Sequence, residues 1–202
     1  DDFESARDKI IVGAERKTLT RTPEDMRRTA YHEAGHTLVS VMLPETAPLH
    51  KVTILSRGNT LGVTWSLPKG DDISRSEVEM HSEIMVALGG RIAEEIIYGV
   101  ERRTTGASSD LRHATDVARS MVRSYAMSGM GLMTLDLDSR AYSDATAERM
   151  DIEVNKILDN CYREAKDLVV NNRERLDKLA QALVDKETLD AAAVYELLDV
   201  PP

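Results

Sequence analysis

The sequence predicts a mainly α-helical domain with one small β-hairpin. Aromatic residues make up only 4% of the 202 residues, and alanine, leucine and long charged side chains are abundant, a mixture that favours helix over strand. Hydrophobic residues make up 42% of the chain, enough to bury a sizeable core. Residues typical of strands gather only between positions 51 and 67. We therefore expect a helical core with a small hairpin and a C-terminal helical bundle.

The first part of the chain predicts a linker followed by a long helix. Residues 1–21 are charged with scattered apolar positions, which indicates a short helix and a linker. Thr22 suits a helix cap and Pro23 suits the first helical position, and the acidic residues that follow complement the helix dipole. Pro44 should stop this helix, so we expect it to span residues 22–43.

Two runs rich in β-branched and aromatic residues predict a hairpin over residues 51–67. The runs are "KVTIL" and "LGVTWSL", and a short polar segment with one glycine separates them. In the second run the larger apolar residues alternate with small or polar ones, which is the period of a half-buried strand. The residues expected on its apolar face are Leu61, Val63, Trp65 and Leu67.

The next segment predicts a second long helix. Ser74 and Glu77 have the spacing of a capping box, and Gly99 suits the end of the helix. The adjacent pair Gly89 and Gly90 lies inside this helix, where glycine lowers stability. The pair therefore indicates a place where another helix packs closely.

The remaining chain predicts further helices. A polar loop around Gly106 leads to a helix expected over residues 110–126. From Asp144 onward, apolar residues recur at helical spacing and predict two or three helices that form a bundle. The expected organisation is a linker and short helix over residues 1–21, a catalytic core over residues 22–142 and a C-terminal helical part of the same domain over residues 143–202.

The charge and cysteine content exclude several classes of function. The formal net charge of −9 argues against nucleic acid as a partner, because a phosphate-binding face needs clustered lysine and arginine. A single cysteine, Cys161, rules out an internal disulfide and a zinc site built from several thiolates. We expect Cys161 to be a buried helix residue. No apolar run reaches the length that spans a bilayer.

The stretch "AYHEAGH" at residues 30–36 places two histidines and a glutamate inside the first long helix. His32 and His36 are four residues apart, so their imidazoles project from one face and can bind one cation. Glu33 borders that position and can accept a proton from water bound there. This is the H-E-x-x-H pattern of zinc peptidases. The alternative is two surface histidines on a solvated face.

Catalytic zinc generally takes three protein ligands, so a third must come from elsewhere in the chain. A glutamate on the second helix is a common solution and favours Glu94 or Glu95. Asp110 is also attractive, because the start of a helix helps to keep a carboxylate ionised. Spacing alone does not choose among the candidates, which are Glu83, Glu94, Glu95, Asp110 and Asp116.

Several further blocks accompany the histidine motif: "DKIIVGAERKT" at the start, "LGVTWSLP" at 61–68, "ALGGRIAEEIIYG" at 87–99 and "TTGASSDLRHATDVAR" at 104–119. With these blocks the chain resembles the peptidase domain of the membrane-anchored AAA+ zinc metalloproteases of the FtsH type. The resemblance covers nearly the whole chain. It implies a helical zinc-peptidase domain with a small hairpin or sheet near the active site and a C-terminal helical bundle.

The resemblance also implies roles for individual residues. Asp110 would join the two histidines as the third ligand of one Zn²⁺ per chain, and Glu33 matches the general base. Glu94 or Glu95 would then support the site by orienting a ligand histidine. The reaction implied is hydrolysis of a peptide bond by water that the metal activates.

The resemblance further implies features of a longer protein. A transmembrane anchor and an ATPase module would precede this domain, so ATP would bind only outside it. The full-length protein would be anchored in a bacterial inner membrane or in an inner membrane system of mitochondria or chloroplasts, with this domain soluble on one side. It would form a homo-hexamer or hetero-hexamer and degrade unfolded or membrane polypeptides.

The second strand of the hairpin suggests how a substrate is held. Leu61, Gly62, Val63 and Thr64 would offer an unpaired edge along which an extended peptide aligns by backbone hydrogen bonds. Alternatively, the hairpin only covers the core. Two other functions are compatible with the sequence: a non-catalytic assembly or docking domain stapled by zinc, and a metal-dependent hydrolase for another class of substrate.

Overall fold

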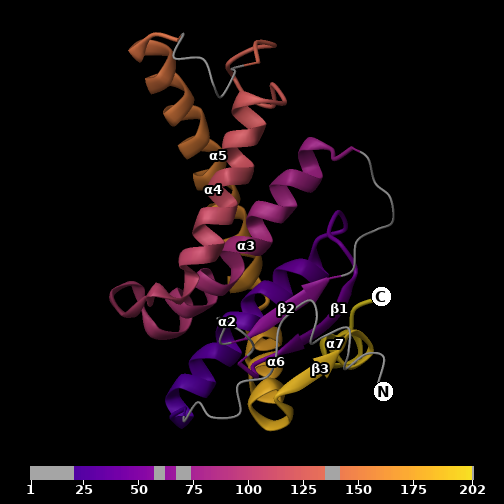
Figure 1. Cartoon of the computed structure of the whole chain (residues 1–202). Helices are drawn as coiled ribbons and strands as arrows, with labels where there is room; N and C mark the ends of the chain where they lie inside the picture. Colours follow the sequence, from indigo (N-terminus) through magenta and orange to yellow (C-terminus); the bar gives the residue numbers. More distant parts are fainter. Residues whose placement is uncertain (1–20, 57–61, 67–73, 135–141, 202) are drawn as a thin grey trace.

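The computed structural model describes residues 21–56, 62–66, 74–134 and 142–201, and within them it confirms a mainly helical protein with a small antiparallel sheet. Figure 1 shows the arrangement. The helices are α2 (Pro23–Met42), α3 (Glu77–Tyr98), α4 (Ser108–Arg123), α5 (Asp144–Asn171), α6 (Arg173–Lys186) and α7 (Ala191–Leu198). The strands are β1 (Leu49–Thr53), β2 (Val63–Ser66) and β3 (Thr188–Asp190), and two short 3₁₀ turns, η1 (Val100–Arg102) and η2 (Thr105–Ala107), precede α4.

Helix α2 begins where the sequence predicts. The Thr22 hydroxyl accepts the backbone N–H of Asp25 at 3.1 Å, and the Asp25 carboxylate accepts the backbone N–H of Thr22 at 3.2 Å. This reciprocal cap, together with Pro23, fixes the first turn. The helix ends at Met42, one residue before its C-cap, so its predicted bounds are confirmed within one residue at each end.

The predicted cap of α3 was wrong by two residues. The capping box is formed by Ser76 and Glu79, and the helix begins at Glu77. Ser74 with Glu77 and Ser76 with Glu79 both have the S-x-x-E spacing, so the pattern alone cannot distinguish the two starts. The predicted end at Gly99 is confirmed, and Gly99 has a φ of 89°, a conformation that glycine adopts without strain.

Helices α2 and α3 cross at a pair of glycines. A Cβ atom on Gly35 would overlap the carbonyl oxygen of Gly89, and a Cβ atom on Gly89 would lie 2.6 Å from the carbonyl oxygen of Gly35. The two backbones therefore touch, which confirms the close packing predicted from the glycine pair. The crossing sets His36, the residue after Gly35, directly against α3.

The sheet has the strand order β2-β1-β3, and both pairings are antiparallel. The predicted hairpin is confirmed as β1 paired with β2, where Val52 faces Thr64. The expected burial alternation along β2 is not observed, because all four of its residues are half-buried. Leu61 and Leu67 lie outside the described residues. Strand β3, which was not predicted, covers the other side of β1, so β2 is an edge of the sheet within the described chain.

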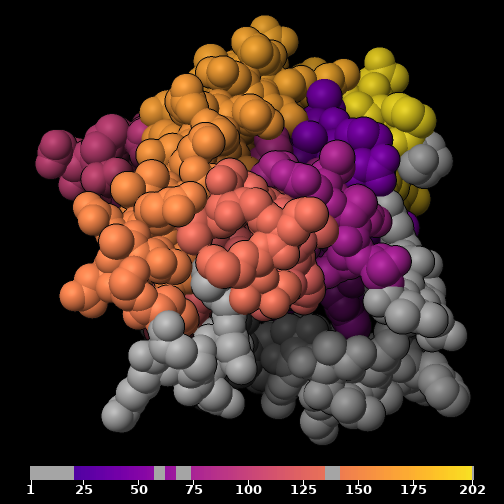
Figure 2. All heavy atoms as spheres, turned by 90° about the horizontal axis from the view of Figure 1, so that it is seen from above, coloured from indigo at the N-terminus to yellow at the C-terminus, as the bar shows by residue number. Residues whose placement is uncertain are grey.

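The C-terminal helices complete one shared core. Helix α6 packs against α2, and α5 packs against both α3 and α4. Figure 2 shows α5 in orange and the end of α4 with its following segment in salmon, lying beside α3. A single buried cluster joins the N-terminal and C-terminal parts, and its fully buried members include Leu38, Ile84, Met121, Leu176 and Leu183.

Three further details bear on the predictions. Helix α4 spans Ser108–Arg123 and not residues 110–126, and Ala126 has a left-handed φ of 53° that cannot continue a helix. Cys161 is buried as predicted, and burial raises the pKa of its thiol to about 12. None of the described helices has the length and apolar composition that crossing a membrane requires.

Candidate metal centre

Helix α2 brings the two histidines of the motif together on the side that faces α3. The Nε2 atoms of His32 and His36 lie 3.0 Å apart, and the rings meet edge to face. Both side chains are nearly buried, with 13% and 11% of their surface exposed. This arrangement follows from the four-residue spacing on one helix face.

Asp110, in the first turn of α4, completes a triangle with the histidines. Its Oδ2 atom lies 3.3 Å from Nε2 of His32 and 3.6 Å from Nε2 of His36. Zinc bonds to nitrogen and oxygen of about 2.0–2.1 Å in tetrahedral geometry place the ligand atoms about 3.3 Å from one another. The triangle therefore has the size that zinc requires. Within the described residues, these three side chains are the only group that could hold a metal ion.

The opposite nitrogens of both imidazoles are already occupied. Nδ1 of His32 lies 2.8 Å from Oε1 of Glu94, and Nδ1 of His36 lies 2.7 Å from the carbonyl oxygen of Val86. Both acceptors require an N–H at Nδ1, so in the neutral imidazoles the Nε2 lone pairs point toward each other and toward Asp110. Facing lone pairs need a positive charge between them, which either a shared proton or a metal ion supplies. The donor set therefore fits zinc.

The charges around the triangle also favour a cation. Burial by itself lowers the pKa of His32, but the carboxylates of Asp110 and Glu94 outweigh burial and raise it to about 10. Burial by itself raises the pKa of Asp110, but hydrogen bonds from His32 and His36 outweigh it and hold that pKa well below its usual range. Two carboxylates are thus ionised beside the imidazoles, as a divalent cation requires.

Glu33 is buried on the same helix and lies against β2. Its Oε2 atom accepts the hydroxyl of Thr64 at 2.8 Å. A Cβ atom on Gly62 would lie 2.7 Å from Oε1 of Glu33, so only glycine leaves space for this carboxylate. The residues just before and within β2 thus contact the side chain that the sequence marks as a proton acceptor.

The two adjacent glutamates of α3 have different surroundings. Glu94 contacts His32, whereas Oε1 of Glu95 accepts hydrogen bonds from the Tyr162 hydroxyl at 2.6 Å and from the Lys166 ammonium at 2.7 Å. Of the two glutamates expected beside the site, the structure therefore brings Glu94, and not Glu95, to a histidine. Adjacent residues on a helix point about 100° apart, so only one of them can face α2.

The other candidate ligands lie outside the triangle. The carboxylate of Glu83 on α3 lies 2.9 Å from Nε2 of His113 on α4, and it also pairs with Arg75, which precedes α3. Asp116 is exposed and lies near Arg119. Neither residue belongs to the metal-binding group.

Gly90 is a site residue that the sequence reasoning assigned only to packing. A Cβ atom on Gly90 would lie 2.5 Å from Nε2 of His36 and 2.7 Å from Nε2 of His32. Because Gly90 has no side chain, space remains beside the Nε2 atoms that would face the metal. Thr104 was also missed, and its hydroxyl lies 3.0 Å from Oε2 of Glu94. The glycine pair in the sequence could have indicated Gly90, whereas no spacing rule indicates Thr104.

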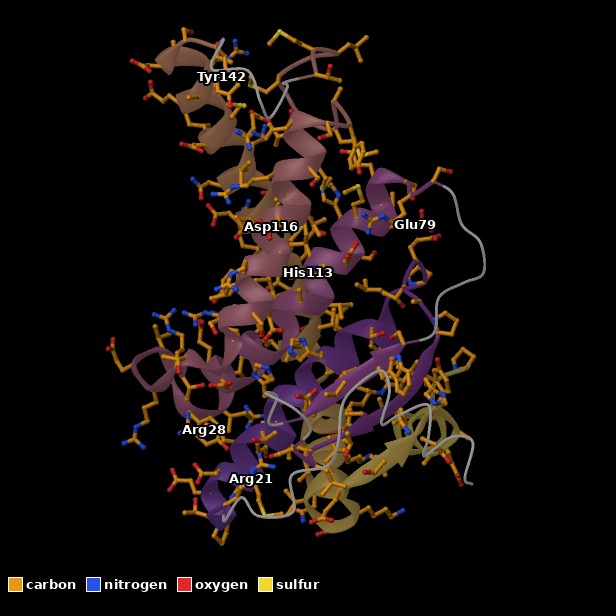
Figure 3. All side chains as sticks on the ribbon, in the orientation of Figure 1. Arg21, Arg28, Glu79, His113, Asp116 and Tyr142 are labelled. Atoms are coloured by element: carbon orange, nitrogen blue, oxygen red, sulfur yellow. The ribbon has the colours of Figure 1, made fainter. Side chains whose placement is uncertain are left out.

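The triangle opens into a cavity of about 1140 Å³. Its lining includes the two histidines, Glu33 and Asp110, together with Gly62, Val63 and Thr64 from the region of β2. Figure 3 labels Arg28, Glu79 and His113, three further lining residues that come from α2, α3 and α4. One cavity, large enough for a peptide segment, therefore contains the metal triangle, the buried Glu33 and the edge of β2.

The fold and this site define a helical metallohydrolase domain of the H-E-x-x-H class. The model of Peptidase family M41 matches residues 19–197, almost the whole chain. The chain therefore belongs to peptidase family M41.

Relatives whose similarity extends over nearly the whole chain support this assignment. An ATP-dependent zinc metalloprotease FtsH from Thermobaculum terrenum is 44% identical and covers 98% of the chain. Proteins of the same name from Acidobacterium capsulatum and Myxococcus xanthus are 40% and 42% identical and cover 100% and 98% of it. The chain spans 32%, 34% and 33% of these three relatives, about one third of their length. The resemblance to FtsH-type metallopeptidases and the zinc metalloendopeptidase class are confirmed.

Proposed function

We propose that this chain is the zinc-dependent endopeptidase domain of an ATP-dependent, membrane-anchored protease that removes unfolded and membrane polypeptides. The observation that carries this proposal is the convergence of the metal triangle, Glu33 and the edge of β2 in one cavity. The names of the relatives support the ATP dependence. The chain spans about a third of those relatives, and in this proposal ATP binding and membrane anchoring would belong to segments outside it.

His32, His36 and Asp110 would hold the zinc ion through Nε2, Nε2 and Oδ2. A bound zinc ion supplies Lewis-acid chemistry, which makes water more acidic and a peptide carbonyl more electrophilic. Three protein ligands leave one corner of a tetrahedral site for water or substrate, whereas a structural zinc site is closed by four. Within the described residues no fourth metal-binding side chain joins the triangle, which favours catalysis over a zinc-stapled docking domain.

Glu33 would act as the general base. It follows His32 directly, its carboxylate is buried, and the hydroxyl of Thr64 holds one of its oxygens. In this position Glu33 takes a proton from the attacking water and passes it to the leaving amine. Positioned acid–base catalysis of this kind contributes about 10²–10⁴-fold to a rate.

Strand β2 would bind the substrate along its edge. It has β1 on one side and is the outer strand in the order of the described sheet. An extended peptide added along this edge passes Glu33, because Gly62 and Thr64 both touch that side chain. Backbone pairing of this kind gives weak sequence selectivity. Leu61, the first residue of the proposed edge, lies outside the described residues.

Peptides with single N-methylated amides test this binding mode. Methylation removes one backbone donor, so kcat/KM should fall sharply at alternate positions near the cleaved bond and little elsewhere. An even response at all positions would contradict pairing with β2.

The substitution Glu33→Gln tests the catalytic proposal. The variant should fold, bind one zinc ion per chain and lose at least about 100-fold in kcat on an unstructured peptide. Glu24→Gln, an exposed change on the first turn of the same helix, is the matched control and should cleave like the wild type. Full activity in Glu33→Gln would remove Glu33 from the role of base.

The separation from the ATPase module defines what this domain can do alone. We expect it to cut flexible peptides and loosely folded chains without ATP and to leave folded proteins intact. ATP-dependent degradation of a folded protein by the isolated chain would contradict this. The proposed homo-hexamer or hetero-hexamer belongs to the full-length protein, and mass measurement of that protein in detergent would test it.

A further inference from the structure

We propose that Thr104 is a positioning residue, which ties the loop carrying Asp110 to the glutamate that orients His32. The proposal rests on the proposed function, because it concerns residues that would hold zinc. It adds a residue that is not one of the three metal-binding side chains and that acts through Glu94.

Glu94 connects His32 with Thr104, in the loop that leads to Asp110. Its side chain is almost fully buried, with 4% exposed. Oε1 faces Nδ1 of His32 at 2.8 Å, and Oε2 accepts the hydroxyl of Thr104 at 3.0 Å and its backbone N–H at 3.3 Å. Without the Thr104 hydroxyl, Oε2 would keep only the longer bond from the backbone N–H of residue 104 and the distant guanidinium of Arg28, at 4.0 Å. A buried carboxylate that loses its shorter hydrogen bond is destabilised and less firmly oriented.

The Thr104 hydroxyl has two functions in its own loop. While it donates to Glu94, it also accepts the backbone N–H of Gly106 at 3.2 Å and so caps η2. Turn η2 leads directly into α4, whose first turn carries Asp110. One hydroxyl therefore fixes the carboxylate behind His32 and the start of the segment that delivers the third ligand.

The neighbouring residues hold the same loop from both sides. Arg28 of α2 donates to the carbonyl oxygen of Arg102 at 2.8 Å, and Arg103 lies 3.8 Å from Glu95 of α3. Three consecutive residues thus anchor the loop on α2, which carries the two histidines, and on α3, which carries Glu94. Of these anchors, Thr104 is the one that contacts the partner of a histidine in the metal triangle.

The test compares zinc affinity among matched variants by competition with a chromophoric chelator. Thr104→Val keeps the shape and removes the hydroxyl, and we expect its zinc dissociation constant to rise about 10–100-fold, as for other partners behind metal ligands. Thr104→Ser restores the hydroxyl and should stay within about threefold of the wild type. Thr115→Val is the control, since it removes a hydroxyl that bonds only within α4, at 2.7 Å to the carbonyl oxygen of Leu111.

Two further measurements separate positioning from a general loss of stability. In a double-mutant cycle, Thr104→Val should add little to Glu94→Gln, because both act through one carboxylate. Zinc should raise the Tm of Thr104→Val by less than it raises the Tm of the wild type. This reduction should exceed any fall in the Tm of the metal-free variant. Thr104→Ala repeats the test if valine is not accommodated.

The outcomes distinguish this inference from the proposed function. Wild-type zinc affinity in both Thr104→Val and Thr104→Ala, or equal losses in Thr104→Val and Thr115→Val, would overturn the role of Thr104 alone. Failure of the folded wild type to bind zinc would overturn the proposed function.

Discussion

Nδ1 of His32 lies 2.8 Å from Oε1 of Glu94, and this contact joins α2 to α3 directly behind the metal triangle. A carboxylate in this place fixes the tautomer of the imidazole and raises its basicity as a ligand. The neighbouring Glu95 has no such contact and binds Tyr162 and Lys166 of α5. The two adjacent glutamates therefore serve different purposes.

This difference predicts that the same substitution affects zinc binding at one of these neighbouring positions and not at the other. Glu94→Gln should weaken zinc binding about 10–100-fold, because the amide no longer holds the His32 imidazole as a carboxylate does. Glu95→Gln should leave the zinc dissociation constant unchanged. Chelator competition measures both, and equal zinc affinities in the two variants would contradict the assignment.

The Glu95 cluster predicts a pH-dependent contribution to stability. Burial by itself raises the pKa of Glu95, but the hydrogen bonds from Lys166 and Tyr162 outweigh burial and lower that pKa. A lowered pKa in the folded state stabilises the protein above the unfolded-state pKa of about 4.3 and ceases to do so as the pH falls through the folded value. Glu95→Gln should therefore cost about 1–3 kcal/mol at pH 7 and progressively less below pH about 4.

Urea unfolding of the metal-free wild type and Glu95→Gln at several pH values measures this difference. A difference in the free energy of unfolding that grows as the pH falls would contradict the sign. Tyr162→Phe removes one of the two donors and should show a smaller loss with the same pH trend.

The glycine pair of α3 predicts two separable defects. Alanine normally stabilises a helix interior by about 1 kcal/mol relative to glycine. In Gly90→Ala the new methyl would collide with the Nε2 atoms of the histidines, so zinc binding should fall by at least tenfold while the protein still folds. In Gly89→Ala the methyl would meet the backbone of Gly35, so the free energy of unfolding itself should fall. Circular dichroism with zinc titration separates these results, and tight zinc binding in Gly90→Ala would count against the site.

The hydroxyl of Thr64 predicts an effect on turnover without an effect on metal binding. It donates to Glu33 at 2.8 Å and lies 3.2 Å from the hydroxyl of Thr37. Thr64→Val should lower kcat about tenfold, the equivalent of one hydrogen bond to a charged group, and Thr64→Ser should restore most of it. Zinc content should match the wild type in both variants, so a loss of zinc in Thr64→Val would show that Thr64 supports the metal site.

The sequence predicts those features that depend on local chemistry. The start of α2 follows from Thr22 and Pro23, and the facing imidazoles follow from the spacing of His32 and His36 on one helix. The hairpin follows from two β-rich runs, and the closely packed glycines follow from the cost of glycine inside a helix. Each of these predictions rests on a pattern within a short stretch of the sequence.

Features that depend on distant contacts were predicted poorly or only through the resemblance. Asp110 lies 74 residues after His36, and spacing alone did not choose it over the glutamates of α3. Strand β3 has three residues and forms by pairing with β1, which is distant from it in the sequence. No local sequence pattern therefore predicts it. The different orientations of Glu94 and Glu95 depend on which helix packs on which face of α3.

The most direct test of the central claim is reconstitution of the metal-free chain with zinc while peptide cleavage is recorded. We predict that chelation abolishes cleavage, that activity returns in proportion to added zinc, and that the titration ends at one zinc ion per chain. Cleavage that survives complete removal of metal, or a folded chain that binds one zinc ion and leaves every unstructured peptide intact, would contradict a catalytic site built on His32, His36 and Asp110.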